Sequence, residues 1–133
     1  MDKLSSLQVR QFMTEVSATV RPDASILGTI DLFLRDGKAG AAVVDDEGQV
    51  VGVLSVRDCL KYLVAAHYEN MPLGAVRNYM SREVRTVTPD TSLLEVATGF
   101  IDSNVRCLPV MEDGRLVGQI NRLEVLRAVS VSA

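Results

Sequence analysis

The stretch Thr19-Val20-Arg21-Pro22-Asp23 returns 67 positions later as Thr86-Val87-Thr88-Pro89-Asp90. Upstream of each copy, Val9-Arg10-Gln11-Phe12-Met13 matches Val76-Arg77-Asn78-Tyr79-Met80 at the same spacing. A repeat that extends over a whole chain indicates two similar structural units that pack together. We therefore expect any ligand sites to come as a related pair.

Composition limits the class of protein. The chain has 133 residues, 47% of them hydrophobic, and a net charge of -3 at pH 7. Two units of about 60 residues each are marginal alone, so a shared core is expected. A negative net charge argues against general nucleic-acid binding, which requires a basic surface. The apolar runs are too short to span a bilayer, and the first residues lack the apolar stretch of a signal peptide.

The two cysteines also limit the class of protein, although less strongly than the composition does. Cys59 and Cys107 have no metal-ligand spacing, and a single pair is not a disulfide framework. We interpret both as reduced structural residues and expect a cytoplasmic protein without DNA or a membrane as partner.

Each repeat shows the same order of structural signals. Apolar residues recur at helical spacing through residues 26–34 and 93–101, after Asp23 and Asp90, which we expect to be the N-caps. A hairpin should follow in each repeat, with its turn glycine at Gly48 or Gly114. The remaining predicted elements are the strand pairs 41–44 with 50–54 and 108–111 with 116–120, and the closing helices 55–65 and 121–128.

The predicted organisation is strand, helix, strand, strand, helix, repeated twice. The first unit covers residues 1–66, a linker covers residues 67–75, and the second unit covers residues 76–133. This order predicts an α+β protein, a sandwich of the α/β type, in which sheets and helices form separate layers.

The sharpest local signal is a polar residue followed three positions later by an acid at the start of each closing helix. Ser55 precedes Asp58, and Asn121 precedes Glu124. This spacing is that of a capping box, in which two side chains satisfy the free amides of a first helical turn. A carboxylate here could also accept both hydroxyl protons of a ribose diol, beside helix amides that suit a phosphate. Both interpretations remain open on the local sequence.

The ordered set of these features resembles the CBS domain, and the whole chain resembles a tandem pair of them, a Bateman module. Each repeat contains Met, then Thr-Val-x-Pro-Asp, an apolar strand, an acidic turn with glycine, and Gly-x-apolar-x-x-x-acid. The resemblance implies two units related by a pseudo-two-fold axis and packed sheet to sheet, with two clefts between the sheets. It also implies adenosine ligands, homodimerisation into a four-domain disc, and a regulatory, non-catalytic role.

The resemblance assigns the main cleft to the ribose-binding segment of the first repeat and to residues of the second. Asp58 would hold the ribose, with Ser55 and Arg57 beside it, and Arg82 and Arg106 would contact phosphate. The full expected set is Val53, Ser55, Arg57, Asp58, Met80, Arg82, Val84, Val105 and Arg106.

The second cleft would be weaker, because its residues depart from the family pattern. Asn121 replaces Ser or Thr, Glu124 replaces Asp, and Glu15 stands where the other cleft has Arg82. An additional carboxylate near a phosphate is repulsive. The expected set is Met13, Glu15, Lys38, Ala39, Asn121 and Glu124.

The leading hypothesis is a regulatory, energy-sensing module that binds AMP, ADP or ATP, in preference to S-adenosylmethionine or NAD, and signals to a protein partner in trans. The alternative is a ligand-free CBS dimerisation or scaffold protein. An enzyme is excluded from the hypothesis because no nucleotide-binding glycine loop, nucleophile elbow or metal-ligand spacing occurs. No obligatory cofactor or metal is expected.

The homodimer has its own sequence argument. Leu32 beside Gly28, and Val96 beside Gly99, are expected to lie outside the core-facing side of their helices. Exposed apolar residues next to glycine suit close helix packing between chains.

Overall fold

The computed structural model describes residues 3–15, 19–70 and 74–132. The chain forms two compact units: a central unit, Ala18–Val84, and a terminal unit, Met1–Ser17 with Arg85–Ala133. Each unit contains helices and a small antiparallel sheet, which confirms the predicted α+β class. In the described part of the chain, no helix has the length and apolar character needed to cross a membrane.

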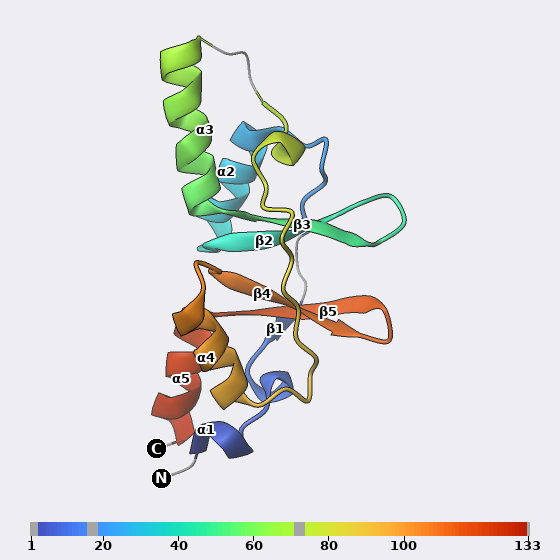
Figure 1. Ribbon diagram of the computed structural model, residues 1–133, viewed down its shortest axis with the longest axis vertical. Coiled ribbons are helices and arrows are strands. Elements are labelled where there is room, and N and C mark those ends of the chain that lie inside the picture. The colour runs from blue at the N-terminus through green and yellow to red at the C-terminus, as the bar shows by residue number, and fades with distance from the viewer. Residues whose placement is uncertain (1–2, 16–18, 71–73, 133) are drawn as a thin grey trace. The chain divides into compact units, whose positions relative to one another are not determined.

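The central unit is a hairpin covered by two helices. Strand β2 (Gly40–Val44) pairs antiparallel with β3 (Val50–Ser55), and Gly48 takes the positive φ of 79° that the turn requires. Helices α2 (Ile26–Asp36) and α3 (Val56–Glu69) lie on the same face of this hairpin (Figure 1). A 3-10 turn, η2 (Val76–Asn78), follows α3.

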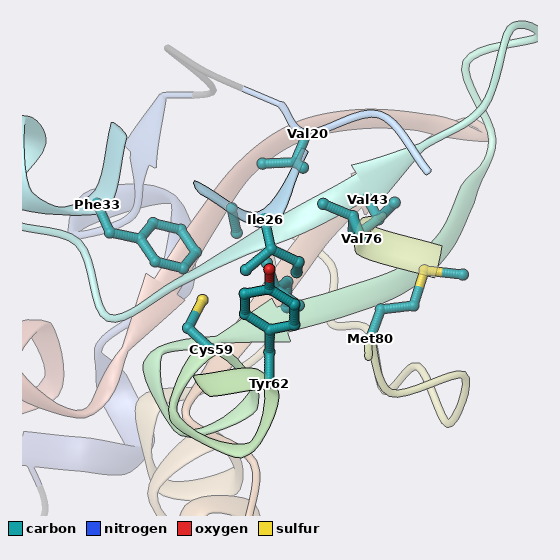
Figure 2. Close-up of a cluster of buried hydrophobic side chains, with 10 residues drawn as sticks. Val20, Ile26, Phe33, Val43, Cys59, Tyr62, Val76 and Met80 are labelled. Atoms are coloured by element: carbon teal, nitrogen blue, oxygen red, sulfur yellow. The ribbon is translucent and has the colours of Figure 1, made fainter. Parts of the chain in front are cut away.

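The core of the central unit draws side chains from every element (Figure 2). Its buried members are Val20, Ile26, Phe33, Ala41, Val43, Leu54, Cys59, Tyr62, Val76 and Met80. The Tyr62 ring meets the Tyr79 ring edge to face, with centroids 5.1 Å apart. Burial of such apolar side chains is the main stabilising term, at roughly 1.5–3 kcal/mol for each large one.

The terminal unit repeats this arrangement with one additional strand. Its elements are α1 (Lys3–Ser6), η1 (Val9–Gln11), β1 (Thr14–Glu15), α4 (Leu93–Asp102), β4 (Cys107–Glu112), β5 (Arg115–Asn121) and α5 (Arg122–Ser132). The sheet order is β1-β5-β4, and α4 and α5 lie on one face of it (Figure 1). The core includes Val9, Leu93, Val96, Phe100, Leu108, Val110, Ile120, Val125 and Ala128.

The N-cap prediction was wrong by two residues. The caps of α2 and α4 are Ser25 and Ser92, whose hydroxyls accept the amides of Leu27 and Glu95. Asp90 instead forms an ion pair with Arg10. Serine is as good a cap as aspartate, and the chain needs two more residues to turn from the proline into the helix.

The predicted core-facing side of the two helices was only partly right: Ile26, Phe33, Leu93 and Phe100 are in the cores, but other residues of the predicted faces are not. The core side of α4 consists of Leu93, Val96 and Phe100, and Val96 is only 1% exposed, so it is not a surface residue available for dimerisation. Leu34 of α2, which ends the predicted run of apolar residues at helical spacing through 26–34, is 78% exposed. Leu32 is half-buried against the core. Adjacent apolar residues made two stripes possible, and packing against the sheet selected one of them.

Two predicted boundaries differ in smaller ways. The strand expected before each first helix is a single parallel bridge, Val20 with Val43 in the central unit and Val87 with Val110 in the terminal unit. Helix α3 continues to Glu69, three residues into the segment expected to be a linker. Of that segment, residues 71–73 lie outside the described residues.

The compact units do not coincide with the sequence repeats. The first part of each repeat, its leading segment, belongs to the unit formed mainly by the other repeat. The segment of the first repeat around Val9 joins the terminal unit, where the Val9 amide donates to the Thr91 carbonyl at 2.9 Å. The matching Val76 segment of the second repeat joins the central unit and donates to Ala24 at 2.9 Å. Each leading segment therefore completes the unit formed by the other repeat.

Two glycines permit each leading segment to approach the strand along which it pairs, a close contact that is called the crossing. A Cβ on Gly52 of β3 would lie 2.8 Å from the Ser81 carbonyl oxygen, and a Cβ on Gly118 of β5 would lie 2.7 Å from that of Thr14. Real Cβ atoms do not approach backbone oxygen so closely, so the backbone would have to move. The methionine before each crossing, Met80 or Met13, packs over the same glycine.

We predict that Gly52→Ala and Gly118→Ala each lower the free energy of unfolding by about 1–3 kcal/mol, because a methyl group would overpack the crossing. Chemical denaturation measures the change. Gly28→Ala and Gly99→Ala are matched controls in the same two units, since open space surrounds both helical positions. These two should stabilise by about 0.5–1 kcal/mol. Equal effects at all four positions would contradict the packing argument.

Candidate functional site

The N-terminus of α3 carries the best-formed polar constellation of the central unit. Ser55 is the N-cap, and its hydroxyl accepts the Asp58 amide at 3.2 Å. Asp58 Oδ2 in turn accepts the Ser55 amide at 2.8 Å and the Ser55 hydroxyl at 3.0 Å. The predicted capping box is confirmed, and it holds the Asp58 carboxylate in one orientation.

Only one of the two Asp58 carboxylate oxygens is used by this cap. Within the described residues, Oδ1 accepts no hydrogen bond, and the side chain is half-buried rather than enclosed. A fixed carboxylate with an unused acceptor oxygen can bind a hydroxyl donor without losing its structural role. The site therefore offers a preorganised acceptor next to a helix N-terminus.

The leading segment of the second repeat lies along the edge of β3, close to this cap. Val53 and Ser81 exchange backbone hydrogen bonds of 3.0 and 2.9 Å. Val53 and Ser55 point to the face of β3 opposite Leu54, because side chains alternate along a strand and Leu54 is in the core. The central unit thus brings together Val53, Ser55, Asp58 and the backbone of residues 80–82.

The other predicted members of the central unit differ in what they can offer. Met80 is buried in the core over Gly52, so its side chain is committed to packing (Figure 2). Arg57 and Arg82 are exposed, and Arg82 makes only a long 3.4 Å hydrogen bond to the Arg77 carbonyl. Val84 is half-buried. Both guanidinium groups are therefore available to an anion.

The terminal unit contains the corresponding cap in a more enclosed form. Glu124 Oε1 accepts the Asn121 amide at 2.8 Å, and Asn121 Oδ1 accepts the Glu124 amide at 2.9 Å. This second capping box confirms the pairing predicted from the spacing. Glu124 is only 6% exposed, whereas Asp58 is half-buried. The longer acid therefore presents less of its carboxylate to solvent.

The leading segment of the first repeat lies beside this second cap. Strand β1 pairs Thr14 with Gln119 and Glu15 with Gly118, which aligns Met13 and Glu15 along β5. Val105, also in the terminal unit, is half-buried, and Arg106 is exposed.

Lys38 and Ala39 belong to the central unit, where the Ala39 carbonyl accepts the Val56 amide at 2.9 Å. This contact ties the loop before β2 to the first residue of α3.

Sequence reasoning missed two residues that shape these caps. Ser81 supplies the backbone pairing with Val53. The equivalent residue of the first repeat is Thr14, which pairs with β5 in the same way. The hydroxyl side chain that both repeats have at this position was the available sequence signal. Arg122, the first residue of α5, donates to the carbonyls of Phe100 and Ser103 at the end of α4. Nothing in the local sequence of Arg122 indicates this long-range cap.

Cys59 follows Asp58 and faces the core rather than solvent. Burial, and to a smaller extent the charge of Asp58, raises the pKa of the Cys59 thiol above its ordinary value. Within the described residues no cluster of His, Cys, Asp and Glu could hold a metal ion. Cys59 is therefore a packing residue.

We predict that Cys59 reacts with iodoacetamide at pH 8 much more slowly in the folded protein than in guanidinium, because the thiolate is the reactive form. Mass spectrometry of the Cys59 peptide after timed labelling measures the ratio. Labelling at the same rate in both states would show that the thiol is neither buried nor raised in pKa.

The family model of the CBS domain matches this chain twice, over residues 9–65 and 76–131. The chain therefore belongs to the CBS domain family and contains a tandem pair of these domains. The predicted family is confirmed.

Individual relatives agree with this assignment. The chain is 33% identical over 119 residues to the uncharacterised protein MJ1225 of Methanocaldococcus jannaschii, covering 90% of this chain and 41% of that protein. It is 28% identical over 127 residues to the A-adding tRNA nucleotidyltransferase of Aquifex aeolicus, covering 96% of this chain and 15% of that enzyme. The chain thus spans less than half the length of these two relatives.

Among solved structures, the CBS-pair protein CBSX2 of Arabidopsis thaliana, crystallised in complex with AMP, matches with a TM-score of 0.77 and 28% sequence identity. The match covers 95% of this chain and 98% of that chain.

Proposed function

We propose that this CBS pair is a regulatory module that binds an adenine nucleotide of the AMP, ADP or ATP type at the Ser55–Asp58 cap. The observation that carries the proposal is the Asp58 carboxylate, which is fixed by the capping box and keeps Oδ1 unused. A ribose diol presents two adjacent hydroxyl donors, and a carboxylate is the acceptor that matches them. The AMP complex of the 28% identical CBSX2 supports this ligand class.

The surroundings of Asp58 favour a ligand with phosphate. Arg57 and Arg82 of the same unit are exposed and make no ion pair within the described residues. Guanidinium groups bind phosphate oxygens in a bidentate manner, and Arg57 lies in the first turn of α3, at the positive end of its dipole. Val105 and Arg106, in the terminal unit, remain predictions from the family resemblance.

We further propose unequal ligand occupancy, with the Asp58 site favoured over the Glu124 site. Glu124 is enclosed, and the exposed Glu15 takes the repeat position of Arg82. A phosphate is attracted by the cation Arg82 and repelled by the anion Glu15, so this replacement favours the Asp58 site. The resulting module would bind ligand mainly through the central unit.

As part of this proposal, the module itself is not an enzyme, requires no obligatory cofactor, and signals ligand binding to a protein partner in trans from the cytoplasm. Two buried cysteines without a disulfide fit a reducing compartment. The enzyme-named relative is much longer, and its match to this chain covers 15% of it, which suits a module that accompanies other domains. The alternative is a ligand-free scaffold, which differs from the proposed module in that no nucleotide would raise its thermal stability.

We predict that one of AMP, ADP, ATP, NAD or S-adenosylmethionine at 1 mM raises the thermal stability of the protein. A ligand with a Kd of about 10 µM adds about 2.7 kcal/mol at this concentration. Asp58→Asn should abolish the shift, because asparagine keeps one oxygen for the cap but loses the second acceptor. The unliganded Tm should change little, which separates loss of binding from loss of fold. No shift with any ligand would favour the scaffold alternative.

Glu124→Gln is the matched variant in the terminal unit. Under unequal occupancy it leaves most of the ligand-induced shift in place, since the main site lies at Asp58. Titration calorimetry giving two equal sites per chain, or an equal loss in both variants, would contradict the asymmetry.

We also propose that the protein is a homodimer. Both units expose large apolar residues on their helices, including Leu34 on α2, Leu60 and Tyr68 on α3, Ile101 on α4 and Leu126 on α5. Such helix surfaces are typical of association sites rather than of a free monomer surface.

We predict that light scattering at micromolar concentration gives a mass near 29 kDa, about twice the 14.5 kDa chain. A mass of one chain at this concentration would contradict the homodimer.

A further inference from the structure

The C-terminal ends of α2 and α4 hold corresponding places in the two units, but different groups close them. The last carbonyls of a helix lack amide partners within the helix. In α2 the amides of Gly37 and Lys38 both donate to the Phe33 carbonyl, and Gly37 takes a positive φ of 64°. This is the usual closure by a glycine that follows a helix. The residue of α4 that corresponds to Phe33 is Phe100.

Helix α4 is closed by a side chain instead. The chain leaves it in an extended conformation at Ser103, with φ −141° and ψ 169°. Asn104 stands at the position of Gly37 but does not take a positive φ. Arg122 Nη2 donates to the carbonyls of Phe100 at 3.1 Å and Ser103 at 3.3 Å. These two hydrogen bonds, which do for α4 what the glycine does for α2, are called the Arg122 clamp below.

The clamp connects the loop between α4 and β4, residues 103–106, to the start of α5, which packs beside α4 (Figure 1). Arg122 is the first residue of α5 and directly follows Asn121, which pairs with Cys107 of β4. Its guanidinium carbon lies 6.0 Å from the centroid of the Phe100 ring, within range of a cation–π interaction. The loop is therefore held at both ends: by the arginine side chain where it leaves α4, and by strand pairing where β4 begins.

The hydrogen bonds of the clamping side chain are incomplete. Arg122 is half-buried, and its Nε is buried without a hydrogen-bond acceptor among the described residues. A buried donor without a partner costs free energy, which offsets part of what the two carbonyl contacts contribute. The corresponding residue of the central unit is Val56, which has no side-chain donor. We therefore expect the closure of α4 to open more readily than that of α2, because rotation of one side chain is enough.

We infer that the Arg122 clamp is a releasable closure of the 103–106 loop, and that its release opens this loop while the rest of the terminal unit stays folded. Local opening of this kind occurs in segments with few buried contacts, and Asn104 and Arg106 are exposed. Since the loop carries Arg106, Arg122 is also a positioning residue for that guanidinium. The opening of the loop does not depend on a ligand, whereas the consequence for Arg106 rests on the proposed function.

Hydrogen exchange followed by mass spectrometry tests the clamp. Arg122→Met keeps an unbranched apolar side chain beside Phe100 and removes the hydrogen-bond donors. The amides of residues 99–107 should exchange at least about tenfold faster in this variant, while those of residues 108–120 keep their wild-type rates. Faster exchange throughout the terminal unit would show that Arg122 only stabilises the fold. That result, or unchanged exchange in residues 99–107, would overturn the inference.

Two variants are matched controls. Val56→Met places the same side chain at the corresponding position of the central unit, where Gly37 closes α2, so residues 32–40 should keep their exchange rates. Arg127→Met removes an exposed arginine from the same helix and controls for the loss of a positive charge. Faster exchange of residues 99–107 in Arg127→Met would assign the effect to charge and contradict the clamp.

A glycine rescue separates the clamp from general stabilisation. Asn104→Gly supplies the residue type that closes α2 at the corresponding position. In the double variant with Arg122→Met, exchange of residues 99–107 should return most of the way to the wild-type rate, since the two closures replace each other. Exchange as fast as in Arg122→Met alone would show that the arginine does not stand in for a glycine.

Nucleotide binding tests the consequence for Arg106. If this residue contacts phosphate as predicted, Arg122→Met should reduce the thermal shift given by AMP and leave that given by adenosine, which has no phosphate. Equal reduction with both ligands, or with neither, would overturn the positioning role. A wild-type protein that shows no shift with any nucleotide would overturn the proposed function and this consequence together, while the exchange experiments decide the clamp separately.

Discussion

Each unit depends on one close contact, the crossing, at which a paired backbone segment approaches a glycine of the sheet. Gly52 and Gly118 have no room for a side chain, because the carbonyl oxygens of Ser81 and Thr14 lie 2.8 and 2.7 Å from where a Cβ atom would stand. These crossings attach the leading segment of one repeat to the sheet of the other. Each unit is consequently composed of both halves of the sequence, which explains why a 60-residue repeat need not be stable alone.

The same crossing prepares the candidate site. Pairing of Ser81 with Val53 fixes the segment that contains Arg82 next to the strand that ends in Ser55. The strand leads directly into α3, so the cap residues follow without an intervening loop. Rigid elements therefore position the acceptor carboxylate, and a site on such elements loses little entropy when it binds a ligand.

The two caps show how one structural device can differ in its capacity to bind. Asp58 closes its capping box with one carboxylate oxygen and is half-buried, whereas Glu124 closes the other box and is buried. Both satisfy the free amides of a first turn, which is the structural requirement. The requirement for a ligand is an additional accessible acceptor, and in the described structure Asp58 meets it better.

The sequence by itself determined the repeat, the α+β class, the family, both hairpins and both capping boxes. Each of these depends on residues near one another in the chain, such as Ser55 with Asp58, or on the exact recurrence of a pattern. The sequence did not determine the inward stripe of α4, because Leu93, Leu94, Val96 and Ala97 permit two apolar faces. Only packing against the sheet chose Val96 for the core. The exchange of leading segments and the cap that Arg122 provides for α4 were likewise decided by tertiary structure, since they join residues that no local pattern connects.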